Sequence, residues 1–253
     1  MTEKESAPFW SLLAPEHAEV FERLFRDELE RQKLEALAEF AAGVGHEFNN
    51  PLAVIGGRAQ LLLREITNEE HRKHLASILS QVRRAYEMIA DIRLFARPPK
   101  PEPVEADITA ILHTMVTKFS DANSDNEIVW DLHNVSDDVR LYMDPGFLET
   151  IFAALCKNSV EAIGTQGQIK ISCEYCPDGV IVQVEDNGPG VPPEHIPLLF
   201  SPYFSGRQAG RGLGFGLCKA QRLLDLMGGH IIFENRTPHG AKFTMILREM
   251  SRD

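Results

Sequence analysis

Cysteine is scarce in this sequence of 253 residues. It occurs four times, at Cys156, Cys173, Cys176 and Cys218. Cys173 and Cys176 form one CxxC pair at the end of a predicted strand, but no second pair follows at the spacing of a metal site. We therefore expect four reduced thiols, with neither a disulfide framework nor a zinc or redox site.

Long apolar runs and an excess of positive charge are missing as well. No segment approaches the length that spans a bilayer, and the first ten residues, MTEKESAPFW, lack the basic and apolar regions of a signal peptide. Lysine and arginine number 26 against 37 aspartates and glutamates, which gives a formal net charge of -11. This balance argues against nucleic acid or an anionic membrane as the main partner. We expect a soluble, cytoplasmic protein.

The rest of the composition is ordinary for a globular protein, and the length allows two modest domains. After a loose arm at residues 1–15, apolar residues recur at spacings of three and four through residues 16–65 and again through residues 70–96. The first series includes Leu34, Leu37, Ala41, Val44, Phe48, Leu52, Ile55, Ala59 and Leu62, and the second includes Leu75, Ile78, Val82, Ala85, Ile89, Ile92 and Ala96.

The two periodic segments predict amphipathic helices joined by a short turn near Thr67. Such a pair forms an antiparallel hairpin that leaves much of both apolar stripes uncovered. Dimerisation into a four-helix bundle would cover them, so we expect residues 16–97 to be a dimerisation domain. Four prolines then end the second helix and make residues 98–103 a short, stiff linker.

Residues 104–253 have a different, mixed pattern. Helices are predicted at 108–119, 145–163 and 213–227, and strands at 127–133, 139–143, 168–176, 179–186, 229–234 and 241–248. Asp144-Pro145 supplies an N-cap and a first-turn proline for the helix at 145–163. The predicted fold class is therefore α plus α/β, with a helical hairpin followed by an α/β domain.

One stretch of the first helix, Gly45-His46-Glu47-Phe48-Asn49-Asn50-Pro51, carries unusual chemistry. His46 falls two residues past Val44, on the face opposite the apolar series. Pro51 cannot donate the backbone hydrogen bond that Glu47 would otherwise accept, so the helix should bend or loosen here. Most lone histidines have no chemistry, but an exposed imidazole beside a carboxylate is a nucleophile with its own base.

Features of the second domain fit a nucleotide. Asn158 lies late in its predicted helix, and its amide oxygen suits Mg²⁺ when the other ligands are phosphate oxygens and water. Asp186 ends a predicted strand and can accept a hydrogen bond from an exocyclic amine, while Gly188 and Gly190 let the backbone approach a flat ring. An ordinary turn would explain the sequence DNGPG equally well.

Two further segments resemble the parts of a lid. Residues 199–207, LFSPYFSGR, could plug a mobile loop or simply pack. Gly210, Gly212, Gly214 and Gly216 alternate up to a helix start, where backbone amides cradle phosphate and glycine hinges let a lid close. The segment lacks the first-strand position and downstream acid of a dinucleotide fingerprint, and no GK[ST] marks a P-loop.

Together these stretches make the chain, from about residue 30 onward, resemble a two-component sensor histidine kinase. HEFNNP resembles the family's phosphoacceptor box, LCKNSVEAI its asparagine box, DNGPG and GLGFGL its two glycine boxes, and LFSPYF its phenylalanine box. GGHIIFENRTPHGAKFTMIL resembles the closing hairpin. The resemblance implies a helical dimerisation and phosphotransfer domain followed by an ATP-binding α/β sandwich of the GHKL type.

The resemblance also assigns roles. His46 would attack the γ-phosphate of ATP, and Glu47 would orient the imidazole and take its proton. Asn50 would position water for removing phosphate from the partner. Asn158 would hold Mg²⁺, and Asp186 would read the adenine amine. The residues that would shape the nucleotide pocket and lid are Gly188, Gly190, Gly212, Gly214 and Gly216, with Arg207 or Arg211 at the phosphates.

The implied cofactors are ATP and Mg²⁺. The implied partners are a second copy of the chain and a response-regulator receiver domain, which would dock near Phe48 and Asn49 and take the phosphoryl group on an aspartate. Whether a subunit would phosphorylate its own histidine or its partner's depends on the handedness of the hairpin turn, which the sequence leaves open.

Some positions depart from the family's pattern. Ala154 stands where another asparagine is common, and Gly206-Arg207 where threonine and lysine are frequent. Leu213 and Phe215 replace a small residue and a leucine. Ala154 leaves a second hypothesis open, a dimeric scaffold that binds nucleotide without transferring phosphate. A third hypothesis, a GHKL protein-serine kinase or mechanical ATPase, would not need the histidine box.

Overall fold

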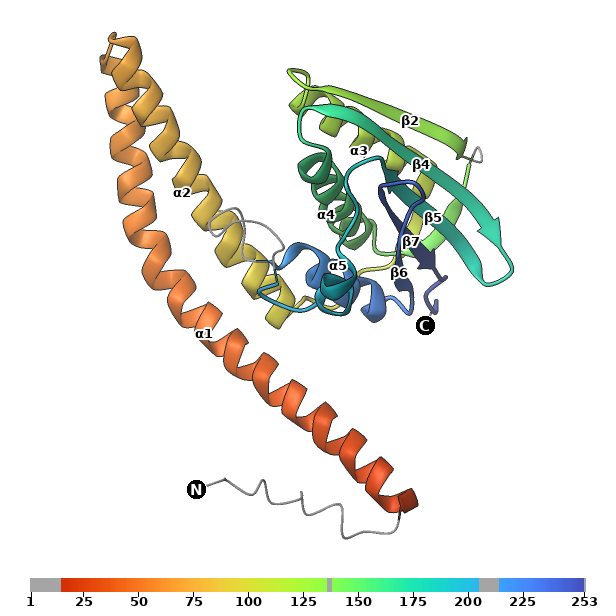
Figure 1. Ribbon diagram of the computed structural model, residues 1–253. Helices are drawn as coiled ribbons and strands as arrows, with labels where there is room; N and C mark the ends of the chain where they lie inside the picture. Colours follow the sequence, from red (N-terminus) through yellow and green to blue (C-terminus); the bar gives the residue numbers. More distant parts are fainter. Residues whose placement is uncertain (1–14, 136–137, 205–213, 253) are drawn as a thin grey trace, which may run out of the picture. The chain divides into compact units, whose positions relative to one another are not determined.

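The structure is a computed structural model that describes residues 15–135, 138–204 and 214–252 (Figure 1). The chain divides into two compact units, Met1–Arg97 and Pro98–Asp253. The first unit is a helical hairpin and the second combines helices with a β-sheet, which confirms the predicted α plus α/β class. Among the described residues, no helix combines the length and apolar character that a membrane span requires.

The first unit consists of α1 (Pro15–Glu65) and α2 (Glu69–Ala96). Asn68 caps α2, because its side-chain oxygen accepts a hydrogen bond from a backbone N–H of the first turn at 3.0 Å. Arg72 closes the hairpin turn by donating to two backbone carbonyls at the end of α1, at 2.6 and 3.0 Å. α1 continues through Pro51 without interruption, as a single curved helix (Figure 1).

The two helices approach closely at two glycines of α1. A Cβ atom on Gly45 would lie 3.4 Å from Ile89 Cγ2, and one on Gly56 would lie 3.3 Å from Val82 Cγ1. The buried residues of α1 whose burial is described are all alanine or glycine. With those of α2, they are Ala41, Gly45, Gly56, Ala59, Leu75, Val82, Phe95 and Ala96.

A second apolar stripe of α1 stays uncovered within this unit. Phe48, Ile55 and Leu62 are 55%, 47% and 46% exposed. They are seven residues apart, so they share one face of the helix. Ala59, from the same predicted series, is buried. The series therefore contains residues that contact α2 and residues that do not.

The second unit contains a five-stranded sheet of order β2-β4-β5-β7-β6 and a two-stranded antiparallel ribbon of β1 and β3. Only the β2–β4 pair of the larger sheet is parallel. The elements are β1 (Val104–Asp107), α3 (Ile108–Ala122), β2 (Glu127–Val135), β3 (Arg140–Met143), α4 (Pro145–Ile163), β4 (Gln166–Cys176), β5 (Gly179–Asp186), the 3₁₀ helix η2 (Pro193–Leu198), α5 (Gly216–Leu226), β6 (His230–Asn235) and β7 (Ala241–Leu247). Strand β1 was not predicted.

The core lies between one face of the sheet and the helices α3, α4 and α5 (Figure 1). Burial alternates along β5 and β7, as expected for strands with one covered face. The opposite face carries a row of alternating charge across four strands, in which Lys170, Glu185, Lys242 and Glu234 are register neighbours. The buried face and the charged face of β5 thus both specify its pairing register with the neighbouring strands. The last residue of β5, Asp186, is the first residue of the candidate site.

Candidate functional site

Asp186 ends β5 and is fully buried. Its Oδ1 accepts hydrogen bonds from Gly188 N at 2.9 Å and Ala241 N at 3.2 Å, and its Oδ2 accepts one from Ser159 Oγ at 3.2 Å. A carboxylate has about four acceptor positions, and the donors among the described residues use three of them, which leaves one position on Oδ2 without a donor there. Burial raises the pKa of Asp186, and these hydrogen bonds oppose that rise.

The loop after Asp186 is fastened to the end of β6. The side-chain oxygen of Asn235 accepts from Val191 N at 2.8 Å, and its Nδ2 donates to Val191 O at 2.7 Å. Arg236 donates through Nη1 to the backbone oxygen of Asp186 at 3.2 Å and pairs through Nε with Glu185 Oε2 at 3.0 Å. These contacts hold the chain on both sides of Asp186 in place.

The glycines of this loop are needed because neighbouring atoms come close. A Cβ on Gly188 would lie 3.0 Å from Asp186 Oδ1. Gly190 has a φ of +77°, and a Cβ there would lie 2.8 Å from Asn235 Oδ1. The segment DNGPG is therefore more than a surface turn, since it is packed around a buried acid.

Asn158 precedes Ser159, the residue of α4 that contacts this carboxylate. Because Ser159 Oγ reaches Asp186, the turn of α4 that holds Asn158 lies at the carboxyl end of β5. Asn158 and Ala154, one turn earlier, are both half-buried. Within the described ranges, no three His, Cys, Asp or Glu side chains gather as a metal site. A single amide oxygen fits a Mg²⁺ ion that is held mainly by phosphate and water.

The aromatic and glycine-rich segments meet at the start of α5. Gly214 has a φ of +71°, and a Cβ there would lie 2.2 Å from Phe204 O. The ring of Tyr203 packs edge-on against the buried Phe215 ring, with centroids 4.9 Å apart. Gly216 begins α5, with open space where a Cβ would stand. The predicted lid residues Arg207, Arg211, Gly212 and Leu213 lie outside the described residues.

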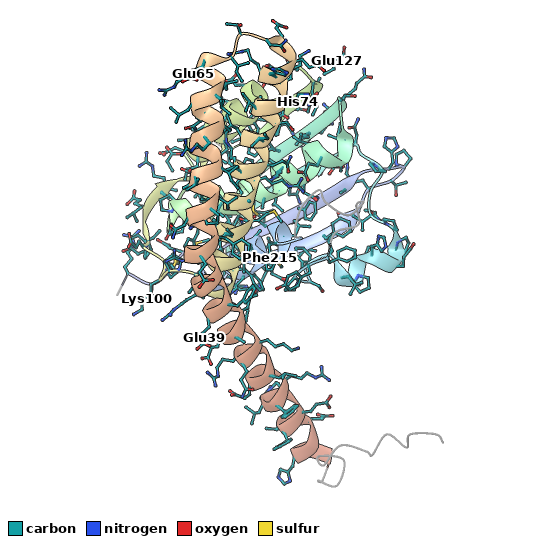
Figure 2. All side chains as sticks on the ribbon, turned by 90° about the vertical axis from the view of Figure 1, so that its left-hand side faces the viewer. Glu39, Glu65, His74, Lys100, Glu127 and Phe215 are labelled. Atoms are coloured by element: carbon teal, nitrogen blue, oxygen red, sulfur yellow. The ribbon has the colours of Figure 1, made fainter. Side chains whose placement is uncertain are left out.

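The histidine box lies in the part of α1 that runs beside α2, between Glu39 and Glu65 in Figure 2. His46 is helical, and its side chain lies outside the described residues. Glu47 and Asn50 are exposed. Asn49 is half-buried, and its backbone oxygen accepts a hydrogen bond from the Tyr86 hydroxyl of α2 at 3.2 Å.

The structure thus joins some of the predicted site residues and separates others. Asp186, Gly188 and Gly190 lie in one loop, and Ser159, the neighbour of Asn158 in the chain, contacts it, whereas His46, Glu47 and Asn50 belong to the other unit. Residue-level reasoning missed four side chains that hold these sites, namely Ser159, Asn235, Arg236 and Tyr86. Only Ser159 had a usable signal, its place in the asparagine box beside Asn158.

Comparison with known families defines the class of protein. Residues 36–100 match the His Kinase A (phospho-acceptor) domain, and residues 143–251 match the histidine kinase-, DNA gyrase B-, and HSP90-like ATPase family. The first match contains the histidine box, and the second contains Asn158, Asp186 and the glycine-rich segment. The chain is therefore a phospho-acceptor domain followed by a GHKL-type domain.

Individual relatives agree with this class. Sensor histidine kinase ZraS of Klebsiella oxytoca is 31% identical over 220 residues, covering 86% of this chain and 47% of the relative. Sporulation kinase C of Bacillus subtilis (strain 168) is 28% identical over 231 residues, covering 90% of this chain and 52% of the relative. This chain belongs to the sensor histidine kinase family. It spans about half the length, or less, of the curated relatives that it matches.

Solved structures show the same folds. The catalytic domain of histidine kinase ThkA is 27% identical, with a TM-score of 0.52, and the match covers 59% of this chain and 97% of that one. Full-length ShkA, solved in complex with AMPPNP, has a TM-score of 0.68 at 24% identity, and the match covers 84% of this chain and 47% of that one. The latter is a likeness of fold.

Proposed function

We propose that this chain is an ATP-dependent protein-histidine kinase that phosphorylates His46 and passes the phosphoryl group to an aspartate of a response regulator. One observation carries the proposal. A phospho-acceptor box and a buried acid site, built from Asp186, Gly188 and Ser159, lie on one chain in the order found in sensor histidine kinases.

ATP binds the second unit in this proposal. The remaining acceptor position of Asp186 takes a hydrogen bond from the adenine amine, and Gly188 and Gly190 let the backbone lie close to the ring. Asn158 holds Mg²⁺, which neutralises charge on the phosphates when bound. The residues proposed to cover the phosphates of ATP are Arg207, Gly212, Gly214 and Gly216.

The phosphoryl group then moves to the first unit. A ring nitrogen of His46 attacks the γ-phosphorus, the bond to the β,γ-bridging oxygen breaks, and ADP leaves. Glu47 takes the proton from the ring. The N–P bond is a high-energy donor, so a receiver aspartate can accept the group. Asn50, one turn after His46, is assigned to orient water when the same surface removes phosphate from the regulator.

The proposed partners are a second copy of this chain and a receiver domain. The uncovered stripe of Phe48, Ile55 and Leu62 supports a homodimer, because a second hairpin would bury it. A solved complex of histidine kinase ThkA with response regulator protein TrrA supports a receiver-domain partner of that class. Because the reaction consumes ATP, we propose that both domains lie in the cytoplasm.

Incubation of the whole chain with Mg²⁺ and γ-labelled ATP tests the proposal. We expect an acid-labile, base-stable label that His46→Gln abolishes and that chelation of Mg²⁺ prevents. His74→Gln is the matched control, since His74 is an exposed histidine of α2 (Figure 2), and it should keep the label. A wild-type chain without label, with or without a receiver domain, would contradict the proposal and favour the nucleotide-binding scaffold. Acid-stable label on serine would favour a serine kinase.

A further inference from the structure

Tyr86 of α2 contacts the backbone of the histidine box. Its hydroxyl donates to the backbone oxygen of Asn49 at 3.2 Å, and both residues are half-buried. The bond therefore lies within the contact between the two helices. It joins α2 to the turn of α1 that holds Glu47 and Asn50.

That turn is short of hydrogen bonds of its own. Pro51 has no N–H, so the Glu47 carbonyl receives no helical hydrogen bond from residue 51. Across the part of the chain that the structure describes, no donor reaches the buried Oδ1 of Asn49. A turn with a missing main-chain bond is easily displaced. A donor from outside the helix therefore has more effect here than elsewhere along α1.

The surrounding packing shows what the bond controls. Gly45 and Asn49 are one turn apart on the side of α1 that meets α2, and Gly45 comes within 3.4 Å of Ile89 when a Cβ is added. Glu47 and Asn50 are exposed on other sides of the same turn. Gly45 allows the two helices to come close, and the bond from the Tyr86 hydroxyl adds a second point of contact one turn later, which opposes rotation of the turn about the axis of α1.

We propose that Tyr86 is a positioning residue for the phosphorylation of His46, because its hydroxyl fixes residues 45–51 against α2, both in their position along the axis of α1 and in their rotation about it. This inference rests on the proposed kinase function. In-line attack on phosphorus requires close placement of the nucleophile, so a loosened turn slows the transfer. ATP binding is assigned to the other unit and should not change.

Tyr86→Phe tests the proposal, since it removes only the hydroxyl. Amide hydrogen exchange at residues 48–54 should become about two- to tenfold faster, in line with the loss of one hydrogen bond, while exchange at residues 56–63 stays the same. In the same protein, kcat for His46 phosphorylation should fall about tenfold or more, with KM for ATP unchanged.

Tyr175→Phe is the matched control. The Tyr175 hydroxyl accepts a hydrogen bond from Arg140 N at 3.2 Å, so the variant loses a bond of the same length, in the second unit. Both the exchange at residues 48–54 and kcat should equal those of the wild type.

Each other outcome overturns the proposal or the function on which it rests. If exchange at residues 48–54 is unchanged in Tyr86→Phe, the hydroxyl does not fix the turn. If exchange is faster but kcat is unchanged, the role of Tyr86 is purely structural. A rise in KM for ATP without a fall in kcat also contradicts a positioning role. A wild-type chain that takes up no phosphate overturns the proposed function itself, while the exchange rates still decide whether Tyr86 holds the turn.

Discussion

Asp186 is a buried acid whose carboxylate accepts three hydrogen bonds from the described residues, one fewer than it can accept. Gly188 N, Ala241 N and Ser159 Oγ donate to its carboxylate, and Arg236 reaches only its backbone oxygen. A buried carboxylate that is not fully hydrogen-bonded lowers stability, and burial raises the pKa of Asp186 accordingly. A ligand amine would supply the missing donor, so the residue is better suited to binding than to stabilising the fold.

Asp186→Asn separates these two effects. The amide oxygen can keep the bonds from Gly188 N and Ala241 N, and the amide nitrogen can donate to Ser159 Oγ, so the variant should fold. The nitrogen cannot accept from an adenine amine, and a hydrogen bond to a charged group contributes about 1.5–3 kcal/mol. We expect affinity for ATP to fall about 10- to 100-fold by calorimetric titration of the whole chain. Asp178→Asn, in the exposed turn before β5, should bind as the wild type does.

The same variant should change how stability depends on pH. Since the pKa of Asp186 is raised above its usual value of about 3.9, the folded state holds this proton more tightly than the unfolded state. The contribution of Asp186 to the unfolding free energy therefore falls as pH rises from about 3.9 through the folded pKa. Asp186→Asn lacks this titration, so the unfolding free energy of the variant minus that of the wild type should rise over this interval. A flat or falling difference would contradict the raised pKa.

Gly214 and Gly216 are equivalent in the glycine-rich sequence but not in the structure. Gly214→Ala places a Cβ 2.2 Å from Phe204 O at a φ of +71°, so we expect the second unit to lose about 1–3 kcal/mol of stability. Gly216→Ala has open space at the first turn of α5 and should leave stability unchanged or raise it by up to about 1 kcal/mol. Urea unfolding checks both, and equal losses would contradict the described contact with Phe204.

Asp144, the residue that caps α4, also binds the predicted linker. Asp144 is 8% exposed, and its Oδ1 caps α4 by accepting from Phe147 N at 3.0 Å. Its Oδ2 accepts from Glu102 N, in the proline-rich segment, at 2.8 Å. One carboxylate thus holds a helix start and the last part of the linker.

Asp144→Ala should therefore cost more than the loss of a cap. We expect about 2–4 kcal/mol of stability to be lost, because two backbone donors lose their partner. Asp107→Ala is the matched control, since Asp107 caps α3 with one backbone hydrogen bond, from Ala110 N at 2.8 Å. Its ion pair with Arg140, at 3.9 Å, is exposed and contributes little, so the variant should cost about 1 kcal/mol. Urea unfolding followed by Trp130 fluorescence, in a Trp10→Phe background, compares them. Equal costs would show that the bond from Glu102 contributes nothing.

Sequence reasoning predicted most helices and strands, because caps, prolines and apolar spacing are local signals. It missed β1, a four-residue strand that exists only through its pairing with β3. It expected the last helix from about residue 213, whereas α5 begins at Gly216. The apolar series of α1 did not reveal that Ala59 faces α2 while Ile55 does not, since heptad spacing is the same for a partner in the chain and one outside it.

The candidate site shows the same limit. The residues expected at the nucleotide, Asp186 and Gly188, could be proposed from motifs that occupy short stretches of sequence. Their supports could not, because Asn235 and Arg236 act on a loop more than 40 residues away in the chain. Tyr86 likewise reaches Asn49 across the hairpin. Such contacts depend on the three-dimensional fold, and a single sequence carries no signal for them.

At the scale of the whole molecule, the hairpin has more apolar surface than its own contacts cover. Besides Phe48, Ile55 and Leu62, the neighbouring Val54 and Leu61 are 62% and 54% exposed. A contiguous exposed stripe of this kind marks an interaction surface. It runs along the same part of α1 as the histidine box, so a second copy that covered it would also fix the surroundings of the proposed phosphoacceptor.

Ile55→Lys should therefore dissociate the proposed dimer. A lysine in the middle of the stripe would be buried without a partner, so we expect the Kd of dimerisation to rise about 100-fold or more. Val129→Lys is the matched control, because Val129 is 59% exposed on β2 and lies outside the stripe. Analytical ultracentrifugation over a range of concentrations compares the two with the wild type. A wild type that is monomeric at all concentrations, or an Ile55→Lys chain that dimerises as tightly as Val129→Lys, would rule this surface out as the dimer contact.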